Sequence, residues 1–186
     1  WSYLLFFGFG PFLIAAVYGI YTFLRHEADT ISLQLATLLL ISAGLAFTFM
    51  ATTQGMIRGQ YREQVAGLED GPERDALRNT MRSVDSTQQG LDMAFDIFIS
   101  TGTALLGISL ARRRWFGWWF TVPAIVIGAG GLFLNAASFP TVNASDAGYF
   151  DPGPFYGVFF AVVLAQLIHI GLREFRPGLT EALSGE

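Results

Sequence analysis

The 186-residue sequence contains no cysteine, and all eleven of its basic residues are arginine. Without cysteine, the chain cannot form disulfides, iron–sulfur clusters, thiolate zinc sites or a thiol nucleophile. Without lysine, it cannot form the Schiff base of a retinal pigment or of a lysine-dependent enzyme. The net charge is only −4 and there is no long basic block, so nucleic acid is not an expected partner.

Charged residues of either sign are scarce. They make up 14% of the chain, compared with about 25% in an average soluble domain, and the mean hydropathy is +0.45. Residues 1–24, 30–57 and 153–172 contain no charged side chain at all. A helix needs ~20 apolar residues to cross a bilayer. The sequence therefore predicts an integral membrane protein in contact with lipid.

The apolar runs predict an all-α membrane bundle of five transmembrane helices in one domain, residues 1–186. The predicted spans are 2–24, 30–57, 91–111, 118–137 and 154–170. Because the sequence begins at Trp1 and not at methionine, a sixth helix is possible in the full-length protein. The motif Gly8-Phe9-Gly10-Pro11 predicts a kink or a broken first turn in the first span.

Residues 58–90 are polar but keep a helical repeat, which predicts a helical hairpin that protrudes from the membrane. The turn is expected at Gly71-Pro72, since proline suits the first position of a helix. Two apolar seams should pack on each other across the hairpin. They are formed by Tyr61, Val65 and Leu68 on one side and by Leu77, Met81 and Val84 on the other.

One face of the predicted hairpin carries arginines. Arg74, Arg78 and Arg82 lie within three or four positions of Asp75 and Asp85. Such a face either holds local ion pairs, each worth ~0.3–0.5 kcal/mol, or forms a docking surface. For the arginines taken individually, local ion pairs are the favoured interpretation, whereas the length of the hairpin favours docking.

A compact arginine cluster, Arg112–Arg114, follows the third span, and tryptophans come directly after it. Tryptophan is enriched at the headgroup level, and arginine is enriched on the cytoplasmic side. We therefore expect this end of the bundle to be cytoplasmic, in a prokaryotic inner membrane.

Polar residues also occur at one depth of the predicted bundle, near the base of the hairpin. A charge inside a bilayer costs ~3 kcal/mol or more unless it is paired or hydrated. The layer is therefore expected to be either a clasp in which Arg58 pairs with Asp92 or Asp96, or a site for a proton, a cation or a small polar ligand. Its members are Gln54, Arg58, Asp92, Asp96 and Asn135.

Two histidines, His26 and His169, are predicted near the same ends of the first and last spans. Facing histidines could bind a haem, and His169 alone could bind a chlorophyll-type pigment. The alternative is that both are interfacial or hydrogen-bonded, and we predict no cofactor and no metal.

Small residues at helical spacing predict close helix packing. Inside the bundle the predicted faces are Gly44, Thr48, Ala51 and Gly55 on the second span, and Ala124, Gly128, Gly131, Asn135 and Ser138 on the fourth. The first and last spans are expected to be outermost. Gly8, Gly10, Gly157 and Ala161 are therefore the predicted contacts with another polypeptide.

No catalytic motif is present, and the hydroxyls of Ser100, Thr101 and Thr103 are expected to bond backbone or neighbouring helices. We therefore expect a non-enzymatic accessory or structural subunit of a larger membrane complex, for example an energy-transducing assembly. One alternative is a small transporter or ligand sensor that uses Asp92 and Asp96. Another is a haem- or pigment-binding protein that uses His169.

The runs VDSTQQGLDMAFDIFISTG, GISLARRRWFG, LNAASFP and FTFMATTQGMIR resemble a family of uncharacterised bacterial and archaeal multi-pass membrane proteins, a domain of unknown function. The resemblance covers Leu33 to Leu172. It implies the same topology, and it implies no activity, substrate or catalytic residue.

Overall fold

Helices form all the regular structure in the described part of this computed structural model. The structure describes residues 2–26, 30–111, 113, 115–138, 150 and 152–184, with side chains for all of these except 2–7, 56–58 and 174–184. The elements are α1 (Ser2–Leu24), α2 (Ile31–Thr52), the π-helix η1 (Thr53–Arg58), α3 (Gly59–Gly67), α4 (Pro72–Leu110), α5 (Gly117–Ser138) and α6 (Gly153–Ser184). The predicted all-α class is confirmed.

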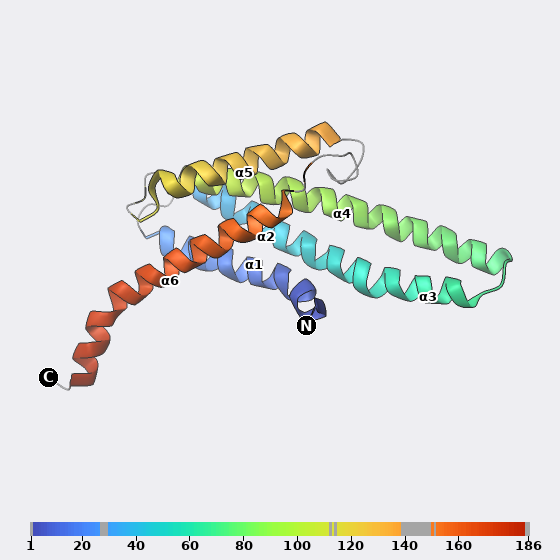
Figure 1. The fold of residues 1–186 in the computed structure, drawn as a ribbon, viewed down its shortest axis with the longest axis horizontal. Helices are drawn as coiled ribbons and strands as arrows, with labels where there is room; N and C mark the ends of the chain where they lie inside the picture. Colours follow the sequence, from blue (N-terminus) through green and yellow to red (C-terminus); the bar gives the residue numbers. More distant parts are fainter. Residues whose placement is uncertain are drawn as a thin grey trace.

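The helices form a bundle centred on α2 and α4. The most extensive contacts join α2 to α4 and α4 to α5, and α1 packs on α2. Helix α6 has much smaller contacts with α5 and α1, and Figure 1 shows its C-terminal turns leaving the other helices. Helices α1, α2, α4 and α5 are therefore packed tightly together, and α6 lies against them more loosely.

Four helical stretches in the described residues are long and apolar enough to cross a membrane. They are Ile31–Gly67, Pro72–Leu110, Gly117–Ser138 and Gly153–Arg173, and the described side chains of α1 form a further, shorter apolar helix, Gly8–Leu24. Large apolar side chains such as Leu38 and Phe133 point outward from the bundle. A soluble protein would bury such side chains, whereas lipid accommodates them. The predicted bundle of membrane-spanning type is confirmed.

The contact between α1 and α2 depends on two glycines, Gly10 on α1 and Gly44 on α2. A Cβ atom on Gly10 would collide with Thr48 and would come within 2.6 Å of the Gly44 carbonyl oxygen. Gly10 therefore allows α1 to approach α2 closely inside the bundle, so the prediction that Gly10 faces another polypeptide is wrong. The predicted broken first turn is also wrong, because α1 runs without a break through Pro11.

The contact between α4 and α5 is similarly close. A Cβ atom on Gly128 would lie 2.5 Å from the Ser100 carbonyl oxygen and 2.6 Å from the Ala104 nitrogen. Gly107 on α4 approaches Ala124 on α5 in the same way. The small face predicted on the fourth span is therefore a packing face, with Ala124, Gly128, Gly131 and Ser138 all buried.

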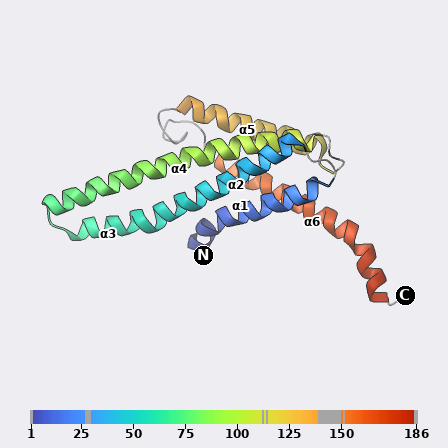
Figure 2. The same ribbon diagram turned by 180° about the vertical axis from the view of Figure 1, so that it is seen from behind.

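The predicted hairpin is present and is made of α3 and the first half of α4. Helix α4 has 39 residues, or ~58 Å at 1.5 Å per residue, about twice the hydrocarbon thickness of a bilayer. Both helices extend beyond the rest of the bundle to a turn before Pro72, which is the first residue of α4 (Figures 1 and 2). The predicted seam is half-buried along its whole length, while the residues between its members are almost all exposed.

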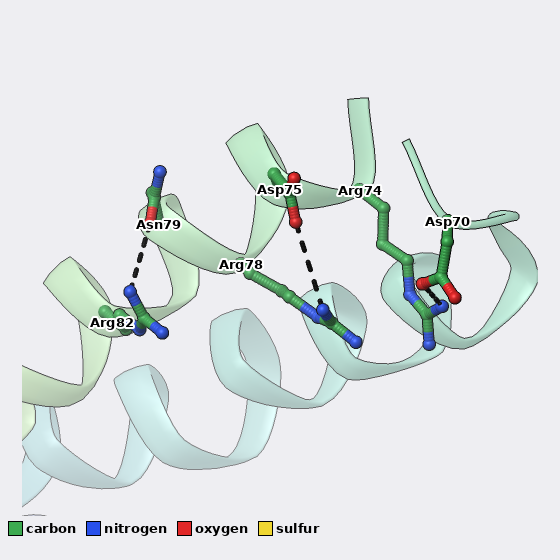
Figure 3. Close-up of polar contacts among 6 residues, drawn as sticks. All are labelled: Asp70, Arg74, Asp75, Arg78, Asn79 and Arg82. Carbon is green, nitrogen blue, oxygen red and sulfur yellow. Dashed lines mark hydrogen bonds and ion pairs between the residues drawn. The ribbon is translucent and has the colours of Figure 1, made fainter. Parts of the chain in front are cut away.

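The hairpin arginines make local contacts, drawn in Figure 3. Arg74 pairs with Asp70 in the turn, and an Arg78 nitrogen lies 3.9 Å from an Asp75 oxygen. Arg82 donates to the Asn79 side chain at 3.4 Å. All three contacts lie within the turn and the first half of α4. The Arg78 and Arg82 contacts are exposed and Arg74 is half-buried, so these contacts contribute little to stability and leave Arg78 and Arg82 available to other molecules.

Two elements differ from the prediction. The second span was expected as one α-helix over 30–57, but its last turns, Thr53–Arg58, are π-helical. The last span was expected to end near residue 170, with a polar tail after it. The α6 backbone continues as a helix through this tail to Ser184.

Candidate functional site

The predicted polar layer lies where α4 leaves the bundle. Asp92 and Asp96 are half-buried on α4, and Asn135 is half-buried near the end of α5. Gln54 on η1 is exposed. The Arg58 side chain lies outside the described residues, so its predicted pairing with Asp92 or Asp96 stays a prediction. Neither carboxylate is without an interaction partner.

The π-helix η1 lies nearer to the hairpin than Asp92 and Asp96 do, because Phe47, which precedes η1, already packs on Phe95 of α4. It contacts α4 as well as α2 and α3. A π-helical turn inserts an extra residue into the helix and so changes which side chains face the neighbouring helix; such turns occur often at functional sites. Thr48 and Thr52, which precede η1, and Thr53, its first residue, each donate to the carbonyl four residues earlier. This kind of hydrogen bond bends helices and is the local signal that the sequence offers for the irregularity.

A second cluster of polar side chains lies deeper in the bundle, one turn of α4 beyond Asp96. The Ser100 and Tyr156 hydroxyl oxygens are 2.6 Å apart, and the Tyr156 hydroxyl donates to the Ile127 carbonyl oxygen at 3.2 Å. Because the tyrosine has one hydroxyl proton and gives it to Ile127, Ser100 must donate to Tyr156. This chain of hydrogen bonds connects α4, α6 and α5. The expectation that Ser100 bonds a neighbouring helix is confirmed.

Glycine 131 makes the Tyr156 contact possible. A Cβ atom at this position would collide with the Tyr156 hydroxyl and would lie 2.7 Å from the Ser100 hydroxyl. The Asp96 carboxylate is close enough to act electrostatically on the same tyrosine. Thr103, fully buried on α4, has no hydrogen-bond partner for its hydroxyl among the described residues. Carboxylates and hydroxyls thus follow one face of α4 into the bundle.

We expect Tyr156→Phe to destabilise the bundle by about 1 kcal/mol, the usual worth of hydrogen bonds between membrane helices. Gly131→Ala should cost more, because the new methyl group displaces the tyrosine. In the Tyr156→Phe background, however, Gly131→Ala should cost less than it does alone, since the hydroxyl is already missing. Thermal unfolding in detergent measures the stability of the unmodified protein, the two single variants and the double variant.

The control is Tyr18→Phe, at an exposed tyrosine on α1, which should leave the melting temperature unchanged. Equal costs for Gly131→Ala in both backgrounds would contradict the assigned contact.

At the opposite end of the bundle, Arg113 points inward and is only 6% exposed. It donates from Nε to the Ser109 carbonyl and from Nη1 to the Leu24 carbonyl, each at 3.2 Å. These carbonyls belong to the last turns of α4 and α1, where backbone acceptors lack helical donors and the helix dipole favours a cation. Arg113 therefore caps two helices at once, a structural role that the arginine cluster did not reveal.

Two further contacts close this end, which carries Arg25, Arg113 and Arg173. The Ser109 and Ser32 hydroxyl oxygens are 3.0 Å apart, and their hydrogen bond joins α4 to the start of α2. The Gln166 amide donates to the Trp115 carbonyl at 3.0 Å, joining α6 to the loop before α5. Together with Tyr156, Gln166 ties α6 to the bundle at two levels.

The two histidines are both exposed. His26 follows the last turn of α1, and His169 lies on α6. Among the described residues there is no group of three or more His, Asp or Glu side chains that could hold a metal ion. The sequence contains no cysteine that could add a thiolate ligand.

Comparison of the chain with protein-family models, with curated proteins and with solved structures finds no match.

Proposed function

We propose that this chain is a non-catalytic accessory subunit of a larger membrane assembly, such as an energy-transducing complex. The interior polar groups support this proposal because they serve in packing. Tyr156, Ser100, Ser109, Gln166 and Arg113 all join one helix to another. No nucleophile with an adjacent base occurs among these contacts.

The observation that carries the proposal is an open groove between α1 and α6. Its volume is about 270 Å³, and its α6 side includes the small residues Gly157, Ala161 and Ala165. A Cβ atom on Gly157 would meet nothing within 4 Å, so no described part of the chain packs on this position. Small residues let another membrane helix approach closely, which is how helices associate in lipid. We name this surface the α1/α6 flank.

The hairpin offers a second surface, outside the membrane. Its outer faces are exposed and carry both signs of charge, including Glu63, Glu73, Asp75 and Arg78. Two spans can be joined by a few residues, whereas this chain uses two ordered helices. A docking role explains that extra length. We also propose that the end with Arg25, Arg113 and Arg173 is cytoplasmic.

The test replaces one glycine on the flank and one outside it. We expect Gly157→Leu to release the chain from its assembly, because the larger side chain prevents close helix approach. The matched control is Gly19→Leu on α1, where a Cβ atom also meets nothing within 4 Å. Blue native electrophoresis of mildly solubilised host membranes measures the assembly, and thermal unfolding checks that both variants stay folded.

A stable particle with the mass of one chain, obtained from the unmodified protein in mild detergent, would refute the accessory-subunit proposal. Normal assembly of Gly157→Leu would move the contact away from the flank. An exchange of charge at the exposed hairpin residue, Arg78→Glu, then tests the second surface. If that variant also assembles normally, both docking surfaces are wrong.

A second candidate function is binding of a cation or small polar ligand by Asp92 and Asp96. The half-burial of both carboxylates on α4 favours it, because ionisable side chains within a membrane-spanning segment are costly and often functional. Asp96→Asn would then abolish a ligand-dependent rise in melting temperature and leave assembly unchanged. Binding of a haem or pigment at His169 is a third candidate, and a visible absorption spectrum of the purified protein decides it.

A further inference from the structure

The groove between α5 and α6 differs from the α1/α6 flank in the side chains that line it. Its volume is about 310 Å³, and aromatic rings form much of its wall. They come from Trp119 and Phe120 on α5 and from Phe155 and Phe159 on α6. The remaining lining residues are Pro123, Ile127, Val158 and Val162.

The hydrogen bonds of α6 explain why this groove stays open. The Tyr156 hydroxyl is held by Ile127 near one end, and the Gln166 amide is held by Trp115 near the other. Helices α5 and α6 are fixed at these two levels. Between them, the bulky rings prevent the close approach that the glycines allow between α4 and α5.

The lining excludes water and disfavours another protein helix. Every lining residue is apolar apart from the indole N–H of Trp119, and water in such a groove would lack hydrogen-bond partners. A protein helix is ~10 Å wide and needs small residues to approach closely. A single flexible hydrocarbon chain can instead lie between the rings.

The end of the groove at Trp119 carries residues that are typical of the headgroup region of a membrane. Trp118 and Trp119 stack with ring centroids 4.0 Å apart, and both are mostly exposed at the start of α5. Such amphipathic rings prefer the boundary between headgroups and acyl chains. In the sequence just before them, Arg112 and Arg114 flank the inward-pointing Arg113, and arginines near the membrane surface favour an anionic headgroup.

We propose that the α5/α6 groove is a specific site for one anionic glycerophospholipid, with an acyl chain between α5 and α6 and the headgroup beside Trp118 and Trp119. The bound chain fills the space that the protein leaves open and so holds α6 against α5. This proposal does not depend on the accessory-subunit function, since it concerns the other side of α6.

The test compares two valines with almost the same exposure. Val158 lines the groove and is 64% exposed, whereas Val126 on α5 is 63% exposed and lies outside it. We expect Val158→Phe to occupy the groove and to lower the retention of added phosphatidylglycerol at least about tenfold, a 1.4 kcal/mol change. Val126→Phe should keep the retention of the unmodified protein.

Native mass spectrometry of the delipidated full chain, titrated with phosphatidylglycerol or phosphatidylcholine, measures this retention. One tightly held phosphatidylglycerol per chain is expected, with weaker retention of phosphatidylcholine. Adding phosphatidylglycerol should raise the melting temperature of the unmodified protein and of Val126→Phe, but not of Val158→Phe. Equal lipid loss in both variants, or retention of a second polypeptide in place of lipid, would overturn the proposal.

Discussion

Gly128→Ala is expected to destabilise the protein by about 3 kcal/mol, at the upper end of the range for overpacked cores. The added methyl group would lie 2.5 Å from the Ser100 carbonyl oxygen and 2.6 Å from the Ala104 nitrogen. Both are backbone atoms of a helix, so they cannot rotate away as a side chain can. Relief requires α4 and α5 to separate, which loosens the most extensive contacts of the bundle.

Gly130→Ala is the matched control, because it lies two residues away on α5 and its Cβ would meet nothing within 4 Å. It should be neutral or stabilising by up to ~1 kcal/mol, since alanine favours the helix more than glycine does. Thermal or denaturant-induced unfolding in detergent measures both variants. If the two alanine variants have the same melting temperature, the close approach of α4 and α5 is not as described.

The second large effect is expected for Arg113→Met, which keeps much of the side-chain volume and removes the donors. The Ser109 and Leu24 carbonyls would lose a charged partner at the ends of α4 and α1. Hydrogen bonds to a charged group contribute about 1.5–3 kcal/mol each, part of which water recovers at a helix end. We expect a net loss of about 2 kcal/mol.

Arg173→Met provides the comparison, because Arg173 is exposed on α6. It removes the same charge from the same end of the bundle and should leave stability within ~0.5 kcal/mol. Hydrogen exchange gives a second readout, with faster exchange expected in the last turns of α1 and α4 for Arg113→Met alone. If the two substitutions destabilise the protein equally, the loss of stability comes from removing a charge at this end and not from the inward position of Arg113.

Most of the architecture could be predicted from the sequence, because a bilayer imposes a length and an apolar composition on each span. The bounds of α1 and α5 agree with the prediction within one residue. The hairpin could be predicted because its seam keeps the helical repeat while its outer faces are polar. The turn before Pro72 could be predicted because proline suits the first position of a helix.

Rotations of helices and irregular turns could not be predicted in the same way. Gly8 and Gly10 lie two positions apart, yet only Gly10 contacts α2. Which of them faces inward depends on how α1 is rotated, and lipid accepts glycine as readily as a neighbouring helix does. The roles of Tyr156 and Arg113 depend on partners far away in the sequence, the Ile127 and Leu24 carbonyls. No side-chain pattern identifies a backbone carbonyl as an acceptor.

The two limbs of the hairpin differ in mechanical stiffness. Helix α4 is one uninterrupted α-helical rod from the tip of the hairpin to the arginine end, whereas the other limb contains the π-helical turn η1 at the level where the hairpin leaves the bundle. A rod of ~58 Å that tilts by about 10° around its midpoint moves each end by roughly 5 Å, in opposite directions. A force applied to the hairpin tip would therefore reach the bundle through α4 without an irregular turn in its path, whereas the second limb contains η1.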